Sequence, residues 1–437
     1  MARTEECILY RDFENGEILS TMTSLMNSYE TGEEAFENRK EEFFHMAGSL
    51  VEMAGMYGFS GNLWHTYLTQ LLVNHENAFS TASEIRGSVE GSINHLALHD
   101  FEIFKELYDF DLAVFDKAFG TDCADFLCNY VNTGCNSKVY NQRICDRICD
   151  MSRMLAKAST VEEFMADMVQ FYKDFGVGKL GLNKAFRIEH GRDGRPVIAP
   201  ITRIAHVNLD DLVGYELPKQ KLIENTEAFV KGRKANNCLL FGDAGTGKSS
   251  SIKGILNRYY DDGLRIIEVY KHQFQDLNDV IAQIKNRNYK FILYMDDLSF
   301  EEFEIEYKYL KAVIEGGLEK KPDNILIYAT SNRRHLVREK SGDKLEVADD
   351  EDLHSSDTVQ EKLSLVYRFG VRIYFGAPNK KEFQKIVTTL AERYGVTMPT
   401  EELLLKANAW EISHGGLTGR TAQQFIDHIL GTSEEKP

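Results

Sequence analysis

Residues 242–249 have the sequence GDAGTGKS, which places two glycines, a lysine and a serine at the spacing GxxxxGK[ST]. A strand-like run, 237–241, precedes this segment, and apolar residues at helical spacing follow it as far as Gly263. Glycine allows successive backbone N–H groups to turn inward, and the start of a helix adds a positive dipole, so such a loop can surround a polyphosphate. A strand, this loop and a helix in that order predict a phosphate-binding loop in an α/β fold.

The residue types in this loop predict how phosphate and metal are held. Lys248 supplies a point charge for the β and γ phosphates, and Ser249 supplies a hydroxyl for Mg²⁺. The loop residues expected to contact the nucleotide are Gly242, Asp243, Ala244, Gly245, Thr246, Gly247, Lys248, Ser249 and Ser250.

A second apolar strand, 291–295, ends in two acids, which is where a carboxylate for the metal is needed. Asp296 is expected to hold Mg²⁺. Asp297 stands where a carboxylate can activate the attacking water. Aspartate is one methylene shorter than glutamate, so either Asp297 acts through a second water or Glu301 or Glu302 takes this role.

The order of strand-like and helical runs predicts the organisation of the chain. Runs at 238–241, 265–270, 291–295, 325–329 and 371–375 alternate with helical segments. Such alternation is typical of parallel strands with helices on both faces. We therefore predict an acidic helical N-terminal domain at 1–175, a β-hairpin-like linker at 176–206, a nucleotide-binding αβα domain at 207–377 and a helical lid at 378–437.

Charge limits the classes of partner. Residues 1–200 contain 18 Lys and Arg against 31 Asp and Glu, a formal net charge of −13, whereas residues 201–437 carry −4. Nucleic-acid surfaces need clustered positive charge, so a protein target is favoured for the N-terminal domain. A basic run at 333–340 leaves nucleic acid possible but not favoured.

Two further features of the sequence bear on where the protein is found and on whether its cysteines bind a metal. The first 17 residues lack an apolar segment, and no run approaches the roughly 18 apolar residues of a membrane span, so we expect a cytoplasmic protein without membrane contact. Five cysteines lie between 123 and 149, but they form no paired CxxC pattern. Buried, reduced thiols are favoured over a metal site there.

Four segments together resemble the AAA-plus ATPases: 209–215 (LDDLVGY), the phosphate-binding loop, 296–300 (DDLSF) and 329–336 (ATSNRRHL). The chain is most similar to an uncharacterised, chiefly bacterial family of predicted AAA-plus ATP-binding proteins and more distantly to helicase-loader ATPases. The resemblance covers about half of the chain. It implies a parallel five-stranded αβα P-loop domain with a small C-terminal helical lid, an N-terminal all-helical domain, ATP with Mg²⁺, ATP hydrolysis and assembly into homo-oligomers.

The same resemblance assigns roles on the nucleotide side. Val213, Gly214 and Tyr215 match the segment that borders the adenine. Asn332 matches the sensor 1 position, where an amide orients the attacking water beside the γ-phosphate.

Two arginines match residues that act on the γ-phosphate from outside the sheet. Arg368 matches the arginine finger that reaches the nucleotide of a neighbouring subunit, with Arg333 and Arg334 as rivals. Arg420 matches sensor 2, which contacts the γ-phosphate from the lid.

Three other functions stay open at this point. A GTPase would use a base-reading motif that residues 379–382 (NKKE) approach without matching. A nucleotide-dependent switch or scaffold with little hydrolysis would account for Asp297 in place of glutamate. A loader acting on nucleic acid would account for the basic run. ATP hydrolysis that moves the lid and the subunit interface, and so remodels a target on the helical domain, explains the most residues.

Overall fold

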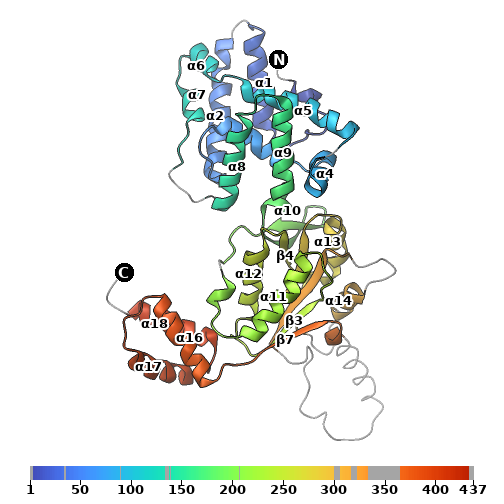
Figure 1. Ribbon diagram of the computed structural model, residues 1–437. Helices are drawn as coiled ribbons and strands as arrows, with labels where there is room; N and C mark the ends of the chain where they lie inside the picture. The colour runs from blue at the N-terminus through green and yellow to red at the C-terminus, as the bar shows by residue number, and fades with distance from the viewer. Residues whose placement is uncertain are drawn as a thin grey trace. The chain divides into compact units, whose positions relative to one another are not determined.

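The computed structural model forms two compact units, Met1–Asn183 and Lys184–Pro437 (Figure 1). The structure describes residues 3–33, 36–88, 90–132, 137, 139–205, 207–299, 306–315, 322–332 and 365–432. Glu301, Glu302, Arg333, Arg334 and the rest of the basic run at 333–340 lie outside the described residues. Their expected roles therefore remain predictions from sequence.

The first unit is all-helical, as expected. Its elements are η1 (Thr4–Glu6), α1 (Glu17–Glu30), η2 (Phe36–Arg39), α2 (Lys40–Tyr57), α3 (Leu63–Asn74), α4 (Ala78–Arg86), α5 (Ser92–Asp109), α6 (Ala113–Phe119), α7 (Cys123–Cys128), α8 (Gln142–Leu155), α9 (Val161–Phe175) and α10 (Gly178–Leu182). Asn62, Asn77, Asn141 and Thr160 begin helices by accepting hydrogen bonds from the first turn.

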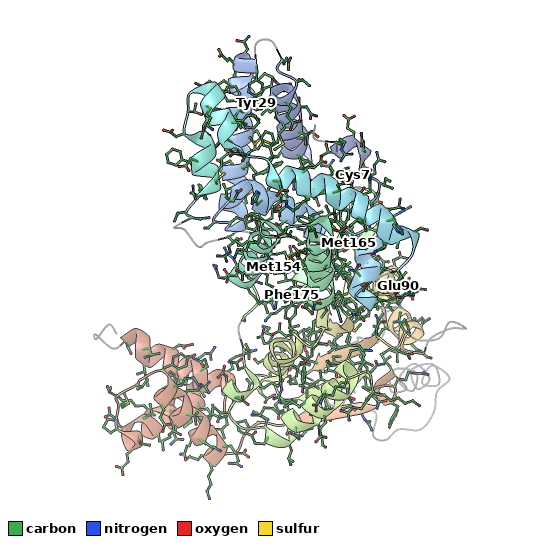
Figure 2. The ribbon with its side chains drawn as sticks, turned by 45° about the horizontal axis from the view of Figure 1, so that its top comes forward. Cys7, Tyr29, Glu90, Met154, Met165 and Phe175 are labelled. Atoms are coloured by element: carbon green, nitrogen blue, oxygen red, sulfur yellow. The ribbon has the colours of Figure 1, made fainter. Side chains whose placement is uncertain are left out.

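The apolar core of this unit, whose side chains are drawn in Figure 2, is rich in aromatic residues. Phe101, Phe104 and Phe164 are fully buried, at positions where the sequence shows helical spacing. The N-terminal segment is held by Asp100, a buried carboxylate that accepts hydrogen bonds from the backbone N–H groups of residues 8–10. A buried polar group needs such hydrogen-bond partners, so this contact fixes residues 8–10 onto α5.

The second unit contains a sheet of seven strands in the order β2-β1-β4-β5-β6-β3-β7. Five of them were expected from the sequence and are parallel to one another: β3 (Cys238–Gly242), β4 (Leu264–Glu268), β5 (Lys290–Met295), β6 (Ile325–Ser331) and β7 (Val371–Phe375). Successive residues of β3, β4, β5 and β6 are buried on both faces, as in a sheet covered by helices on both sides, whereas the edge strand β7 exposes Arg372 and Tyr374.

The other two strands correct the expectation of a linker. The hairpin itself is present, with β1 (Ala185–His190) antiparallel to β2 (Pro196–Pro200). However, β1 also pairs in parallel with β4, so the hairpin extends the sheet to seven strands. Phe186 and Ile188 are buried there, and this apolar burial makes the hairpin part of the sheet domain.

Helices of the second unit cover the sheet and form the lid. Those around the sheet are η3 (Leu209–Asp211), α11 (Glu216–Val230), α12 (Lys248–Tyr259), η4 (Lys271–Asp276), α13 (Leu277–Ile284) and α14 (Glu306–Glu315). The lid consists of α16 (Lys380–Arg393), α17 (Thr400–Ser413) and α18 (Gly419–Thr432), which share their own apolar core. Across the described part of the chain, no helix combines the length and apolarity that crossing a membrane requires.

Asn379 has a structural role at the start of the lid. Its side chain accepts a hydrogen bond from the backbone N–H of Glu382, and the Glu382 carboxylate accepts one from the backbone N–H of Asn379. This capping box starts α16 and accounts for the NKKE sequence without a guanine-reading motif.

Candidate nucleotide site

The phosphate-binding loop is built against the end of β7. Gly242 has a φ of 133°, and a Cβ added there would lie 2.1 Å from the carbonyl oxygen of Phe375. The backbone N–H of Asp243 donates to that same oxygen at 3.0 Å. The Asp243 carboxylate in turn accepts a hydrogen bond of 2.7 Å from the backbone N–H of Ala377. The loop is therefore fixed to the segment that leads into the lid, and only glycine fits at 242.

Lys248 is buried at the centre of this loop, with 6% of its surface exposed. Its Nζ donates to the carbonyl oxygens of Gly242 at 3.1 Å and Asp243 at 2.6 Å. Burial lowers the pKa of Lys248 below its ordinary value, although the charges of nearby aspartates oppose the shift. The ammonium is thus held in place by backbone carbonyls beside the start of α12.

Three hydroxyl groups converge on one oxygen of Asp296. Its Oδ1 accepts hydrogen bonds from Ser249 Oγ at 2.8 Å, Tyr294 Oη at 2.7 Å and Thr330 Oγ1 at 2.5 Å. Partial removal from water raises the pKa of Asp296, but these hydrogen bonds outweigh it and the pKa lies below its ordinary value. The carboxylate is therefore charged near neutral pH and lies beside the serine expected to bind the metal.

Asp297 is held in an uncommon backbone conformation, with a φ of 50°. Its backbone N–H donates to Thr330 Oγ1 at 2.9 Å, and its Oδ1 accepts a hydrogen bond of 2.8 Å from the side-chain amide of Asn332. Thr330 thus contacts both acids, from the neighbouring strand. These contacts turn Asp297 away from the strand direction and place its carboxylate beside Asn332.

Apolar side chains from two elements form the opposite end of the site. Leu212, Val213 and Tyr215 lie between η3 and α11, and Ile386 and Leu390 come from the lid helix α16. Val213 packs against the apolar core of the lid, and Tyr215 lies with its ring 5.5 Å from that of Phe375. The Tyr215 hydroxyl is buried and has no hydrogen-bond partner among the residues that the structure describes.

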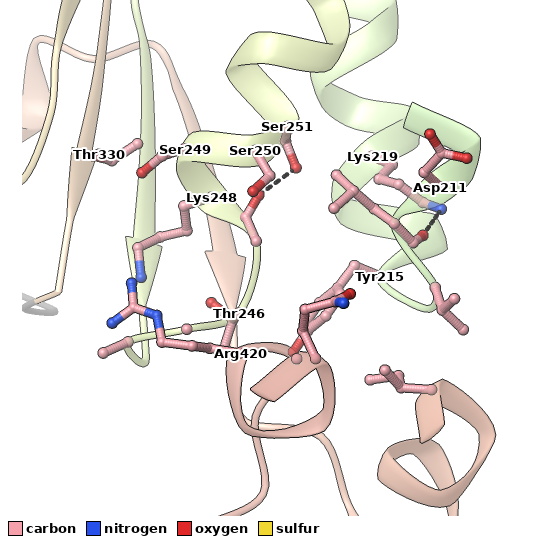
Figure 3. A pocket seen from close by; sticks show the side chains of 18 of the residues that line it. Asp211, Tyr215, Lys219, Thr246, Lys248, Ser249, Ser250, Ser251, Thr330 and Arg420 are labelled. Atoms are coloured by element: carbon pink, nitrogen blue, oxygen red, sulfur yellow. Dashed lines mark hydrogen bonds between the residues drawn. The ribbon is translucent and has the colours of Figure 1, made fainter. Parts of the chain in front are cut away.

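The lid also contacts the loop directly. The backbone N–H of Arg420, at the start of α18, donates to the carbonyl oxygen of Gly245 at 3.2 Å. Figure 3 shows the Arg420 side chain extending from the lid toward Lys248. A Cβ at Gly245 would lie 3.0 Å from Thr418 Oγ1, so glycine permits this close approach.

These groups surround a cavity of about 660 Å³ (Figure 3). The sequence-predicted residues that line it are Val213, Tyr215, Ala244, Gly245, Thr246, Gly247, Lys248, Ser249, Ser250, Asp296, Asp297, Asn332 and Arg420. Gly214, Gly242 and Asp243 support its walls without lining it, and the exposed Arg368 lies outside the lining.

Sequence reasoning missed several lining residues. Thr330 lies in the ATSN segment but was given no role. Ile386 and Leu390 belong to the apolar core of the lid and also line the cavity, and no sequence motif marks them. Leu212 and Lys219 adjoin the predicted adenine segment, and Lys219 Nζ donates to the carbonyl oxygen of Leu212 at 2.7 Å. The only sequence signal for Thr330, Leu212 and Lys219 was therefore their position within or beside a predicted motif.

The described cysteines of the helical unit are fully buried at Cys7 and Cys145 and partly buried at Cys123, Cys128 and Cys149. Cys145 donates to the carbonyl oxygen of Tyr57 at 2.7 Å, and burial raises its pKa to about 11. Burial also raises the pKa of Cys123, Cys128 and Cys149. Among the described residues, which exclude Cys135, no group of three or more His, Cys, Asp or Glu side chains is arranged to hold a metal.

Comparison with known proteins gives one family. Residues 182–433 match the model of the family described as "Protein of unknown function (DUF815)", which is more than half of the chain and includes every residue of the cavity. No curated protein matches the chain.

Solved structures give weaker likenesses. PCH-2 from C. elegans is 17% identical, with a TM-score of 0.34, over 52% of this chain and 65% of that one, so the match spans less than two thirds of PCH-2. The RuvB Holliday junction branch migration motor of Thermotoga maritima is 14% identical, with a TM-score of 0.32, over 52% of this chain and 73% of that one.

Proposed function

Since the chain belongs to the DUF815 family of proteins of unknown function and has a AAA-plus type P-loop fold, we propose that its cavity binds ATP with Mg²⁺ and hydrolyses the β–γ phosphoanhydride bond. One observation carries the proposal. Lys248, Asp296, Asp297, Asn332 and Arg420, which lie far apart in the sequence, all line one cavity. The apolar end of the cavity suits a purine base, and the loop end suits a triphosphate.

The residues at the loop end fit a magnesium ion. Ser249 and Asp296 already lie within hydrogen-bonding distance, and both carry the oxygen ligands that Mg²⁺ prefers. When bound with the nucleotide, Mg²⁺ would neutralise charge on the β and γ phosphates. Metal binding would free the Ser249 hydroxyl from Asp296, while Tyr294 and Thr330 still hold the carboxylate.

The arrangement beyond the metal suits attack by water. We assign Asp297 as the base: the water oxygen bonds to the γ-phosphorus, its proton passes to the Asp297 carboxylate, and the bond to the bridging oxygen breaks to release ADP and phosphate. Asn332 orients the water and the carboxylate together. Lys248 and Arg420 stabilise the negative charge that develops on the transferred group.

Arg368 is assigned to a neighbouring subunit's site. It is exposed on the segment before β7 and does not line the cavity of its own chain, as a residue acting in trans requires. We infer a homo-oligomer in which turnover depends on assembly. Residues 1–183 carry 14 Lys and Arg against 29 Asp and Glu, which favours a protein target rather than nucleic acid for the helical unit.

A second candidate is an ATP-dependent switch with little hydrolysis. The observation in its favour is that Asp297, already shorter than glutamate, is held by Asn332 at 2.8 Å. Steady-state phosphate release by the wild type and by Asp297→Asn decides between the two. Release by the wild type above that of the variant supports hydrolysis, whereas equal background release from both, with ATP still bound, supports the switch.

A further inference from the structure

Tyr294 is a buried residue of β5. Its hydroxyl donates a hydrogen bond to Asp296 Oδ1, the same oxygen that Ser249 contacts. The side chain is 6% exposed, so its hydroxyl has a fixed direction. Thr330, 2% exposed on the neighbouring strand, contacts the same oxygen. The carboxylate is therefore held at one oxygen by two hydroxyls that come from the sheet.

This arrangement limits what the carboxylate can offer to a metal. A carboxylate has about four lone-pair sites on its two oxygens, and the hydrogen bonds of Ser249, Tyr294 and Thr330 all go to Oδ1, so that those of Tyr294 and Thr330 still fill its sites when Ser249 turns to a metal. Oδ2 is then the oxygen left for a metal or for its water. Mg²⁺ needs near-ideal octahedral geometry and takes a single carboxylate oxygen readily, whereas Ca²⁺ accepts more oxygens and often binds both oxygens of one carboxylate.

We propose that Tyr294, together with Thr330, is a positioning residue that makes the site select Mg²⁺ over Ca²⁺ by leaving Asp296 a single oxygen for the metal. The proposal rests on the proposed function of this cavity. The Tyr294 hydroxyl acts through Asp296 from outside the cavity lining, whereas Thr330 lines the cavity and contacts the same carboxylate oxygen.

The chain offers a matched control for the tyrosine. Tyr328 lies on β6 directly opposite Tyr294 in the register, is also buried, and also uses its hydroxyl. Its partners are Asn225 and Thr226 of α11, at 2.9 and 3.0 Å, which are remote from the carboxylate. Tyr328→Phe therefore removes a buried hydroxyl from the same sheet without changing Asp296.

The test is calorimetric binding of a non-hydrolysable ATP analogue to the full-length protein in EDTA, in Mg²⁺ and in Ca²⁺. Wild type and Tyr328→Phe should prefer the Mg²⁺ complex to the same extent. Tyr294→Phe should reduce the Mg²⁺-over-Ca²⁺ affinity ratio about five- to tenfold, with metal-free binding unchanged, because loss of one charge-assisted hydrogen bond frees the carboxylate. Thermal unfolding verifies that each variant is folded.

Thr330→Val provides a second variant should Tyr294→Phe fail to fold, and it should shift the same ratio in the same direction. An unchanged ratio in a folded Tyr294→Phe or Thr330→Val protein would overturn the inference and leave the proposed function intact. Absence of nucleotide binding by the wild type in Mg²⁺ would instead remove the proposed function itself.

Discussion

The side-chain amide of Asn332 donates a hydrogen bond of 2.8 Å to Oδ1 of Asp297, and so joins the ends of two neighbouring strands at the floor of the cavity. This pair should set the rate of the chemical step and leave nucleotide binding unchanged.

Asp297→Asn removes the base and should lower kcat by about 10²- to 10⁴-fold. Asn332→Ala should lower kcat about tenfold or more, or ~1.4 kcal/mol, by releasing the carboxylate. Phosphate release under saturating ATP measures both; equal turnover to wild type would contradict these roles.

Arg368 should act between subunits. Arg368→Ala should keep ATP affinity and lower turnover by about 10³- to 10⁵-fold. The control is Arg372→Ala, which removes a different exposed arginine, one that lies on β7 itself. It should have little effect on turnover. Mixing Arg368→Ala with Lys248→Ala protein should restore part of the activity, because the first supplies an intact cavity and the second an intact arginine. Mixtures as inactive as their components would place the finger at another residue.

Gly242 should tolerate no side chain. Gly263 also has a positive φ, 92° against 133° at Gly242, but an added Cβ there would meet open space, so Gly263→Ala should cost only the backbone strain, about 1–3 kcal/mol. Gly242→Ala adds a contact of 2.1 Å with the Phe375 carbonyl and should destabilise the second unit considerably more. Thermal unfolding of the two variants compares them. Similar midpoints would mean that β7 does not constrain the loop as described.

Much of this fold follows from the sequence because parallel strands buried on both faces appear as short apolar runs. The five runs from residue 238 to 375 all became strands of one sheet. The β1–β2 hairpin was recognised locally, but its pairing with β4 joins residues far apart in sequence, and local alternation carries no information about such pairing.

The candidate site was predictable where chemistry dictates residue type and less so where packing does. Lys248, Ser249 and Asp296 could be predicted because binding of a phosphate and a metal would require those residue types at that spacing. Thr330 and Ile386 line the cavity through tertiary contacts, and threonine or isoleucine at those positions is equally consistent with an ordinary strand or helix interior. The proposed action of Arg368 on a second chain needs an assembly to test it.

The pH dependence of binding should reflect Lys248. Burial lowers its pKa from the ordinary 10.5, so the free protein favours the neutral amine at a lower pH than an exposed lysine does. Affinity for Mg·ATP should be constant near pH 7 and fall as the pH rises through the lowered pKa, by up to about tenfold per pH unit, with the fall beginning below pH 10.5. Fluorescence competition from pH 7 to 10 follows this fall. In a folded Lys248→Arg protein that binds nucleotide, the profile should be flat, and a parallel fall there would assign the titration to another group.

The most direct test of the account is calorimetric titration of the purified protein with Mg·ATP, alongside Lys248→Ala and the control Lys253→Ala, which changes an exposed lysine of the same helix outside the cavity. The account predicts saturable binding by the wild type and Lys253→Ala, and a loss of at least about 100-fold in affinity, or ~2.7 kcal/mol, for Lys248→Ala. No saturable heat from the wild type, or equal affinity in a folded Lys248→Ala protein, would contradict it.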